Sequence, residues 1–264
     1  EGAVRVNKRL KNILLQLWLP ILIILAWWFG SAAYSSSFFP PLSSILDAFR
    51  ENWLFDRVPT EFLPSVWRFL AGFFLGSLVG VIVGIFLGSI PWVYRSLRPT
   101  IDFLRSIPVT TLVSAFIILL GFGDLMNVTY IAWAAFFPVL LNTIDGVLGI
   151  EPTQKDFAQT YRLSRMDRLF RVTLPAASPQ IFVGMRISLA VAPLVMVYGE
   201  MVSTTDGLGF FILFAQNTFR VIDMWSGIIL LGLLGLLVNL IFIAVETRVL
   251  AWHRGWRASV LEGS

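Results

Sequence analysis

The chain contains 264 residues, of which 57% are hydrophobic and only 14% are charged, with a formal net charge of +4. This composition excludes a soluble globular domain and indicates an integral membrane protein. The absence of cysteine excludes disulfide bonds, thiolate metal sites and a cysteine nucleophile.

Six apolar runs are long enough to cross, as helices, the hydrocarbon core of a bilayer, which is about 30 Å thick. They lie near residues 13–33, 64–89, 100–121, 127–148, 178–201 and 226–249. The fold class that these runs predict is an all-α membrane protein with six transmembrane helices.

The first run has an alternative interpretation as a secretory signal, because basic residues precede it and Ser31-Ala32-Ala33 follows it. Its apolar core, from Ile13 to Gly30, is longer than a usual signal core and contains three tryptophans. We therefore favour a retained transmembrane helix.

The distribution of Lys and Arg predicts the orientation of the helices. With the N-terminus in the cytoplasm, only Arg50, Arg57, Arg68 and Arg220 fall at the outer side, and most other basic residues fall inside. Both termini and residues 150–176 are then cytoplasmic. This asymmetry accounts for the basic isoelectric point without a nucleic-acid partner, because the sequence shows no aromatic and basic platform for nucleic acid.

Two short segments are predicted to lie along the outer membrane surface. Residues 42–53 have the amphipathic pattern of an interfacial helix. Residues 210–219 follow the break at Gly207-Leu208-Gly209 and are apolar but too short to span, which fits a surface-lying or re-entrant helix. We divide the chain into residues 1–63, with the N-terminal tail, first transmembrane helix and outer interfacial helix, and residues 64–264, a core of five transmembrane helices.

The second run carries a glycine at every fourth position, so that these glycines share one helix face. They are Gly72, Gly76, Gly80, Gly84 and Gly88. Small residues at this spacing allow helices to pack closely in lipid, and we favour packing within one subunit over packing at a subunit interface. In the third run, Asp102 and Arg105 are spaced to form an ion pair, and Pro108 predicts a kink.

Residues 156–175 are dense in charge yet keep helical apolar spacing. Pro152 is placed to start a helix with an apolar face of Phe157, Ala158 and Tyr161. Ser164 and Asp167 have the spacing of a capping box, which predicts a second short helix from Arg165. The residues expected to point inward from it are Met166, Leu169 and Phe170, and Leu174-Pro175 is expected to end it. Such a basic amphipathic surface fits either anionic lipid headgroups or a soluble docking partner.

Five residues here match, in type and spacing, the EAA loop of bacterial ABC importer permeases. They are Asp156, Ala158, Val172, Leu174 and Pro175. Residues 103–110, 137–143, 184–186, 199–201 and 207–210 resemble the nitrate, sulfonate and taurine branch of that family. The resemblance implies a type I ABC importer permease (MetI-like) fold with a coupling loop at residues 150–176. The ATPase-coupling residues that it implies are Asp156, Phe157, Ala158, Tyr161, Arg162, Ser164, Arg165, Leu174 and Pro175.

Two positions depart from the family motif. Asp156 replaces a glutamate but keeps a negative charge near a helix N-terminus, where it is favourable. Arg162 replaces a glycine that would permit a left-handed turn or close approach to the partner. Arg162 therefore predicts either a different type of turn or a pairing of its own with an acidic patch on the ATPase.

The resemblance also implies the partners: a second copy of the permease, two cytoplasmic ABC ATPase subunits and an extracytoplasmic substrate-binding protein, in the lipid bilayer of a bacterial plasma membrane. The chain has no GxxxxGK phosphate loop. We therefore expect ATP and Mg²⁺ on the ATPase subunits, and expect this chain to bind no cofactor and not to be an enzyme. The expected solute is small and anionic, such as a sulfonate, taurine or nitrate.

Ionisable residues within spans usually face a bundle interior or a cavity. The candidates for a translocation pathway or gate are Glu200, Arg186, Thr110, Thr111, Ser114 and Tyr130. Glu200 fits either a gate or a buried hydrogen-bonding role, whereas for Arg186 we favour a structural or interfacial role. The hydroxyl groups could donate to an anion, although hydroxyls in helices often bond their own backbone.

The alternative function is an ATP-independent secondary transporter or channel. Such proteins tend to carry carboxylates or broken helices at the membrane midplane, whereas Asp102, Asp145 and Glu246 lie near the ends of runs. An intramembrane enzyme with a histidine-based site is disfavoured, because His253 is the only histidine and follows the last run. We therefore expect no metal site.

Overall fold

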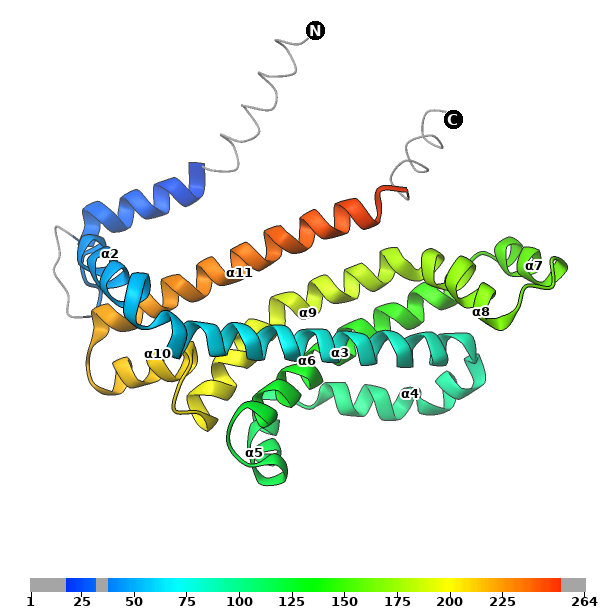
Figure 1. The fold of residues 1–264 in the computed structure, drawn as a ribbon, viewed down its shortest axis with the longest axis horizontal. Coiled ribbons are helices and arrows are strands. Elements are labelled where there is room, and N and C mark those ends of the chain that lie inside the picture. Colours follow the sequence, from blue (N-terminus) through cyan, green and yellow to red (C-terminus); the bar gives the residue numbers. More distant parts are fainter. Residues whose placement is uncertain (1–17, 32–37, 253–264) are drawn as a thin grey trace, which may run out of the picture. The chain divides into compact units, whose positions relative to one another are not determined.

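The computed structural model describes residues 18–31 and 38–252, and the elements within them are helical (Figure 1). The first helix covers Trp18–Ser31. The other α-helices are α2 (Leu42–Glu51), α3 (Leu63–Ser89), α4 (Pro91–Ser106), α5 (Val109–Leu120), α6 (Asp124–Leu148), α7 (Pro152–Thr160), α8 (Arg165–Arg168), α9 (Leu174–Ser203), α10 (Leu208–Asn217) and α11 (Val221–Val249). The π-helical turns are η1 (Asn52–Asp56), η2 (Val58–Phe62) and η3 (Leu169–Thr173). The all-α prediction is confirmed.

The chain divides into two compact units, residues 1–58 with 212–230, and residues 59–211 with 231–264. In the first unit, α2 buries Leu42 and Ile45 and forms where the amphipathic pattern predicts a short helix. The short apolar helix expected after the glycine break also forms, as α10. The division after residue 63 and the position of either helix at a membrane surface stay predictions.

Four helical stretches are long and apolar enough to cross a membrane, as judged by length and composition. They are Val58–Ser89, Asp124–Leu148, Arg165–Ser203 and Val221–Val249. α4 and α5 together would make a fifth, although a bend of 94° separates them. The first predicted run, 13–33, lies partly outside the described residues. The count of six transmembrane helices and the cytoplasmic placement of both termini therefore stay predictions.

The prediction of one kinked helix over residues 100–121 is wrong, because two separate helices meet there. Ile107 has a ψ of 121°, the extended conformation that a following proline favours. Pro108 then precedes the first residue of α5, so the chain turns instead of bending within one helix. The predicted pair within α4 does form, with Arg105 Nε 2.9 Å from Asp102 Oδ1.

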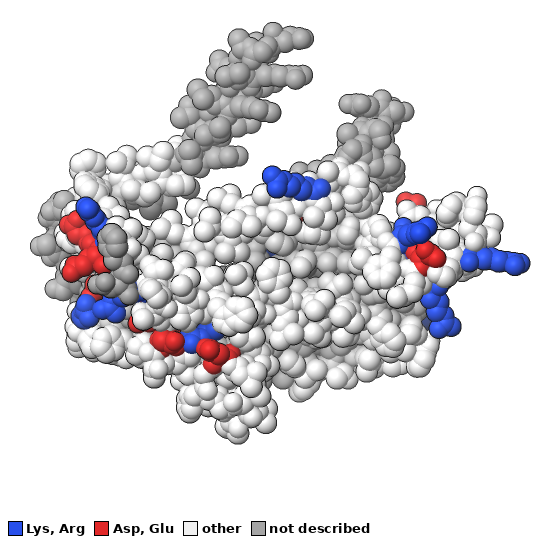
Figure 2. Space-filling model, viewed as in Figure 1, with Lys and Arg blue, Asp and Glu red and all other residues white. Residues whose placement is uncertain are grey.

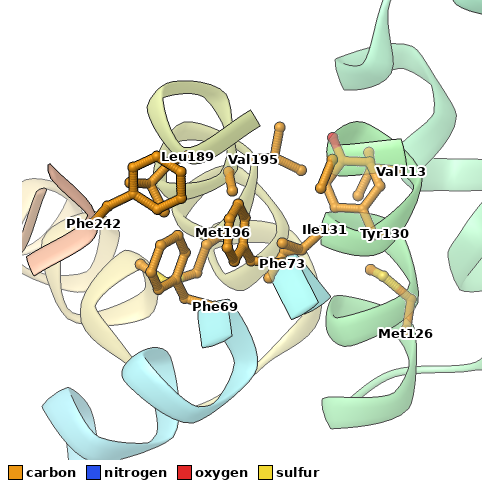
Figure 3. Close-up of a cluster of buried hydrophobic side chains, with 12 residues drawn as sticks. Phe69, Phe73, Val113, Met126, Tyr130, Ile131, Leu189, Val195, Met196 and Phe242 are labelled. Carbon is orange, nitrogen blue, oxygen red and sulfur yellow. The ribbon is translucent and has the colours of Figure 1, made fainter. Parts of the chain in front are cut away.

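In the second unit, α3, α6 and α9 pack side by side (Figure 1). Their contact contains a cluster of buried apolar side chains, including Phe69 and Phe73 from α3, Tyr130 from α6 and Met196 from α9 (Figure 3). Helices in lipid associate through such close packing instead of through transfer out of water. The cluster therefore fixes how these three helices sit against one another.

The glycine stripe of α3 faces α6. A Cβ at Gly76 would lie 2.3 Å from the backbone oxygen of Ala132, and one at Gly84 would lie 2.6 Å from Thr143 Cβ. Side chains at the other three positions of the stripe, Gly72, Gly80 and Gly88, would also meet α6 at 3.0 Å or less. The stripe thus packs within the chain and lets two helix backbones come into contact.

Candidate functional site

The α7–η3 segment, residues 152–173, presents a packed side and an outward side. Ala158 is only 2% exposed, whereas Phe157 and Tyr161 are 56% and 65% exposed. The rings of Phe157 and Tyr161 pack on each other with their centroids 4.3 Å apart. Of the predicted apolar face, only Ala158 is buried in the chain, and the two aromatic residues form an exposed pair.

The turn after α7 is left-handed at Arg162, which has a φ of 49°. The N–H of Leu163 donates to the carbonyl of Ala158 at 3.1 Å, and the N–H of Arg162 donates to the carbonyl of Gln159 at 2.9 Å. These two bonds form a Schellman motif, which usually has glycine at the left-handed position. The expectation of a different type of turn at Arg162 is therefore wrong, and its pairing with an ATPase stays a prediction.

α8 begins at Arg165, as the capping box predicts. The N–H of Asp167 donates to Ser164 Oγ at 3.1 Å, and that hydroxyl donates to Asp167 Oδ2 at 2.7 Å. The expectation that Leu174-Pro175 ends this helix is wrong, because η3 leads directly into α9. Pro175 lies in the first turn of α9, and the wider π-helical turn before it accommodates a residue without an N–H. One helical stretch therefore runs from Arg165 to Ser203.

The outward side of the α7–η3 segment combines apolar and basic side chains. Met166 and Phe170 are exposed, so their predicted inward direction is wrong, while Leu169 is half-buried. A groove of about 490 Å³ beside α7 is lined by residues that include Phe157 and Arg171. Figure 2 shows charged side chains gathered over this end of the second unit, beside a wide uncharged surface. Aromatic residues, Met and Arg are the types enriched at protein interfaces.

A second polar site, the Arg68 cluster, consists of Arg68, Ser65, Asp124, Glu200 and Asp206. Arg68 is buried in α3, and its guanidinium contacts three carboxylates. Nε donates to Asp124 Oδ1 at 2.6 Å, Nη1 to Glu200 Oε1 at 3.0 Å and Nη2 to Asp206 Oδ1 at 2.7 Å. The cluster therefore joins α3, the start of α6, the end of α9 and the turn before α10.

Glu200 is fully buried within this cluster. Its carboxylate accepts hydrogen bonds from the Ser65 hydroxyl at 2.7 Å and from the N–H of Gly209 at 2.9 Å, besides that of Arg68. The chain wraps around it at Gly207, where a Cβ would lie 2.6 Å from the Glu200 carboxyl carbon. This geometry favours the hydrogen-bonding role of Glu200, and a role in gating stays a prediction.

The Arg68 cluster was not predicted from the sequence. Arg68 was named only as a basic residue at the outer side of the membrane. The available signal was an arginine inside an apolar run, where an ionisable residue is expensive and needs a partner. The partners themselves could not be found from sequence, because Asp124 and Asp206 are 56 and 138 residues away.

The other candidate pathway residues do not gather at one site. Arg186 forms an ion pair with Glu246 of α11, which fits the structural role that we favour. Tyr130 is buried in the core, and its hydroxyl donates to the carbonyl of Val109 at 3.1 Å. The other three, Thr110, Thr111 and Ser114, are exposed on α5. The Thr111 hydroxyl donates to the carbonyl of Pro108 at 2.7 Å, so it bonds its own backbone.

A groove of about 460 Å³ lies at the break between α4 and α5. Its lining includes the aromatic side chains of Trp133 and Phe137, together with Arg105 and Asn142. In the part of the chain that the structure describes, no group of three or more His, Asp or Glu side chains could hold a metal ion.

Comparison with known proteins identifies relatives along most of the chain. The model of the family described as "binding-protein-dependent transport system inner membrane component" matches residues 76–251. A putative aliphatic sulfonates transport permease protein of Bacillus subtilis strain 168 is 29% identical over 240 residues, which are 90% of this chain and 87% of that protein. A putative ABC transporter permease protein of Methanocaldococcus jannaschii is 31% identical over 72% of each chain.

A taurine transport system permease protein of Escherichia coli K12 is 27% identical over 88% of this chain and 86% of that protein. Among solved structures, a chain of the inward-facing MetNI methionine ABC transporter superposes with a TM-score of 0.58 and 19% identity. The superposition covers 70% of this chain and 94% of that one, so the two share a fold.

Proposed function

Because the chain belongs to the family of binding-protein-dependent transport system inner membrane components, and is a permease of the ABC importer class, we propose that it imports a small anionic solute. We further propose that ATPase subunits drive this import through the α7–η3 segment. The complex would contain two copies of this chain, two cytoplasmic ATPases and an extracytoplasmic binding protein, in a bacterial plasma membrane. ATP and Mg²⁺ would bind the ATPases, and this chain would not be an enzyme.

The observation that carries the coupling proposal is the continuity of the helix from Arg165 to Ser203. An ATPase that binds beside the exposed Phe157–Tyr161 pair would displace α8, and α8 cannot move far without α9. α9 in turn packs against α3 and α6. Movement at the surface of α7 would thus reach α6 and α9, which both contribute residues to the groove at the break between α4 and α5.

The anionic class of solute is supported by the names of the relatives and by one groove. The relatives include permease proteins named for aliphatic sulfonates, taurine, nitrate and bicarbonate. Sulfonate, nitrate and bicarbonate are anions at neutral pH, and taurine carries a sulfonate. In the α4–α5 groove, Arg105 is the one charged residue among the described lining residues. Its Nε pairs with Asp102, and the other N–H groups of its guanidinium suit such planar or tetrahedral anions.

Transport by reconstituted complexes tests this function and separates it from a secondary transporter. The permease, its ATPases and its binding protein would be placed in proteoliposomes, and uptake of labelled taurine, an alkanesulfonate, nitrate and bicarbonate would be measured. We expect uptake of at least one of these anions only with ATP and Mg²⁺ on the ATPase side. Uptake that follows an ion gradient and ignores ATP would favour the alternative.

A further inference from the structure

A cavity of about 600 Å³ lies between the end of α3, the end of α6 and the α8–η3 stretch. Its walls are mainly apolar and include Ile82 and Phe86 from α3, Val147 from α6 and Leu169 from η3. Two arginines, Arg165 and Arg168, line the same cavity. The cavity therefore offers apolar walls together with two positive charges.

The two arginines differ from their neighbour Arg171 in their partners. Arg171 Nε lies 3.1 Å from Asp167 Oδ1 and forms an ion pair. Neither Arg165 nor Arg168 forms an ion pair with a carboxylate in the described ranges 18–31 and 38–252. Both are exposed, so their guanidinium groups are open to an anionic ligand with which they could form charge-assisted hydrogen bonds.

The apolar walls include exposed side chains of a candidate membrane span. α3 forms most of the candidate span Val58–Ser89, and Ile82 and Phe86 in its last two turns are exposed. The cavity reaches Ser89, Ile90 and Pro91, where this span ends. A ligand that rests here would have its apolar part at the depth of the acyl chains and its anionic part at the level of the headgroups.

We propose that this cavity binds an anionic phospholipid of the surrounding membrane. The phosphate lies against Arg165 and Arg168, and an acyl chain lies over Ile82 and Phe86. Because the cavity is bounded by both α3 and α8, the bound lipid holds the start of the Arg165–Ser203 helix against the end of α3. This inference rests on the chain being a membrane permease. It concerns the cavity that α3 bounds, whereas the ATPase is proposed to bind beside the Phe157–Tyr161 pair.

Native mass spectrometry of the permease purified with its ATPases tests the proposal. Phosphatidylglycerol and phosphatidylcholine of equal chain length would be titrated into the wild-type complex, the double variant R165Q/R168Q and the control R171Q. Each basic residue near an anionic lipid surface contributes roughly fivefold to binding. We expect tighter binding of phosphatidylglycerol, by about tenfold or more, in the wild type and in R171Q, and no preference in R165Q/R168Q.

The same spectra resolve the other outcomes. R165K/R168K keeps both charges, so it should keep most of the preference even if the glutamine variant folds poorly. Equal binding of the two lipids by the wild type would overturn the proposal. A preference for phosphatidylglycerol that survives in R165Q/R168Q would also overturn it. Displacement of the lipid by glycerol phosphate at equal concentration would show a site for a free anion instead, and would also overturn it.

Discussion

The guanidinium of Arg68 lies 3.0 Å from the carboxylate of Glu200, and both side chains are buried. This ion pair connects α3 to the end of α9, where the chain turns through Gly207 toward α10. Asp124 and Asp206 contact the same guanidinium but are partly exposed. The pair therefore holds the far end of the helix that, at its other end, begins in α8.

Loss of Arg68 should destabilise the permease more than loss of the Glu200 charge. R68Q leaves Glu200 fully buried without a cation, and breaking a buried ion pair from one side costs about 3–5 kcal/mol. E200Q leaves Arg68 with Asp124 and Asp206, so its cost should be smaller. Thermal unfolding of the detergent-purified complex should give a lower Tm for R68Q than for E200Q.

The double variant R68Q/E200Q provides the control. Removing both charges leaves no isolated buried carboxylate, so its Tm should be higher than that of R68Q alone. If the decreases in Tm of the two single variants simply add in the double variant, the ion pair does not couple α3 to α9 as described.

Two glycines offer a matched test of the α3–α6 contact. A Cβ at Gly76 would lie 2.3 Å from the Ala132 backbone oxygen, whereas one at Gly232 in α11 meets nothing within 4 Å. G76A should force the two helices apart at a cost of about 1–3 kcal/mol, seen as a lower Tm. G232A should match the wild type or exceed it, because alanine favours the helix. Equal Tm values for the two variants would contradict the packing.

Arg162 should tolerate glycine better than alanine. A left-handed residue with a side chain costs roughly 1–2 kcal/mol, and glycine avoids this cost at some expense of unfolded-state entropy. R162G should therefore be as stable as the wild type or up to about 1 kcal/mol more stable, and R162A should be less stable than R162G. Thermal unfolding of the three proteins checks this order. If R162G had the lowest Tm of the three, the prediction would be contradicted.

The same position separates backbone geometry from charge. If Arg162 pairs with an acidic patch on the ATPase, association should weaken in both R162G and R162A and survive in R162K. Full association in all three variants would leave Arg162 with its conformational role alone.

Local features of the fold were predictable from sequence because their physics is local. Pro152 and the Ser164–Asp167 box placed the starts of α7 and α8 correctly, since a helix N-terminus depends on a few adjacent groups. Pro108 predicted an interruption of the helix over residues 100–121. Whether a proline kinks one helix or divides it into two helices that meet at a bend of 94° depends on the packing around it. The helix likewise continues through Pro175 only because of the π-helical turn η3, and no pattern in the sequence predicted that turn.

The candidate sites divide in the same way. The α7–η3 segment was found from charge density and spacing, yet the outward direction of Met166 and Phe170 depends on which neighbouring helices cover them. The Arg68 cluster was missed because its carboxylates come from three separate segments. Tyr130 was taken as a pathway donor, but the fold buries it against α5, where the Val109 carbonyl accepts its hydrogen bond.

Recovery of the ATPase with the permease most directly tests the central claim, that the ATPase binds the exposed side of the α7–η3 segment. The test variant is F157E, which changes a residue of the exposed aromatic pair. The control variant is F122E, which changes an exposed phenylalanine at the opposite end of α6 from α7. Loss of an interface aromatic costs about 2 kcal/mol or more, or roughly thirtyfold in Kd. We predict that F157E loses most of the ATPase in affinity purification while F122E retains it. Undiminished recovery with F157E, from a folded permease, would contradict the claim.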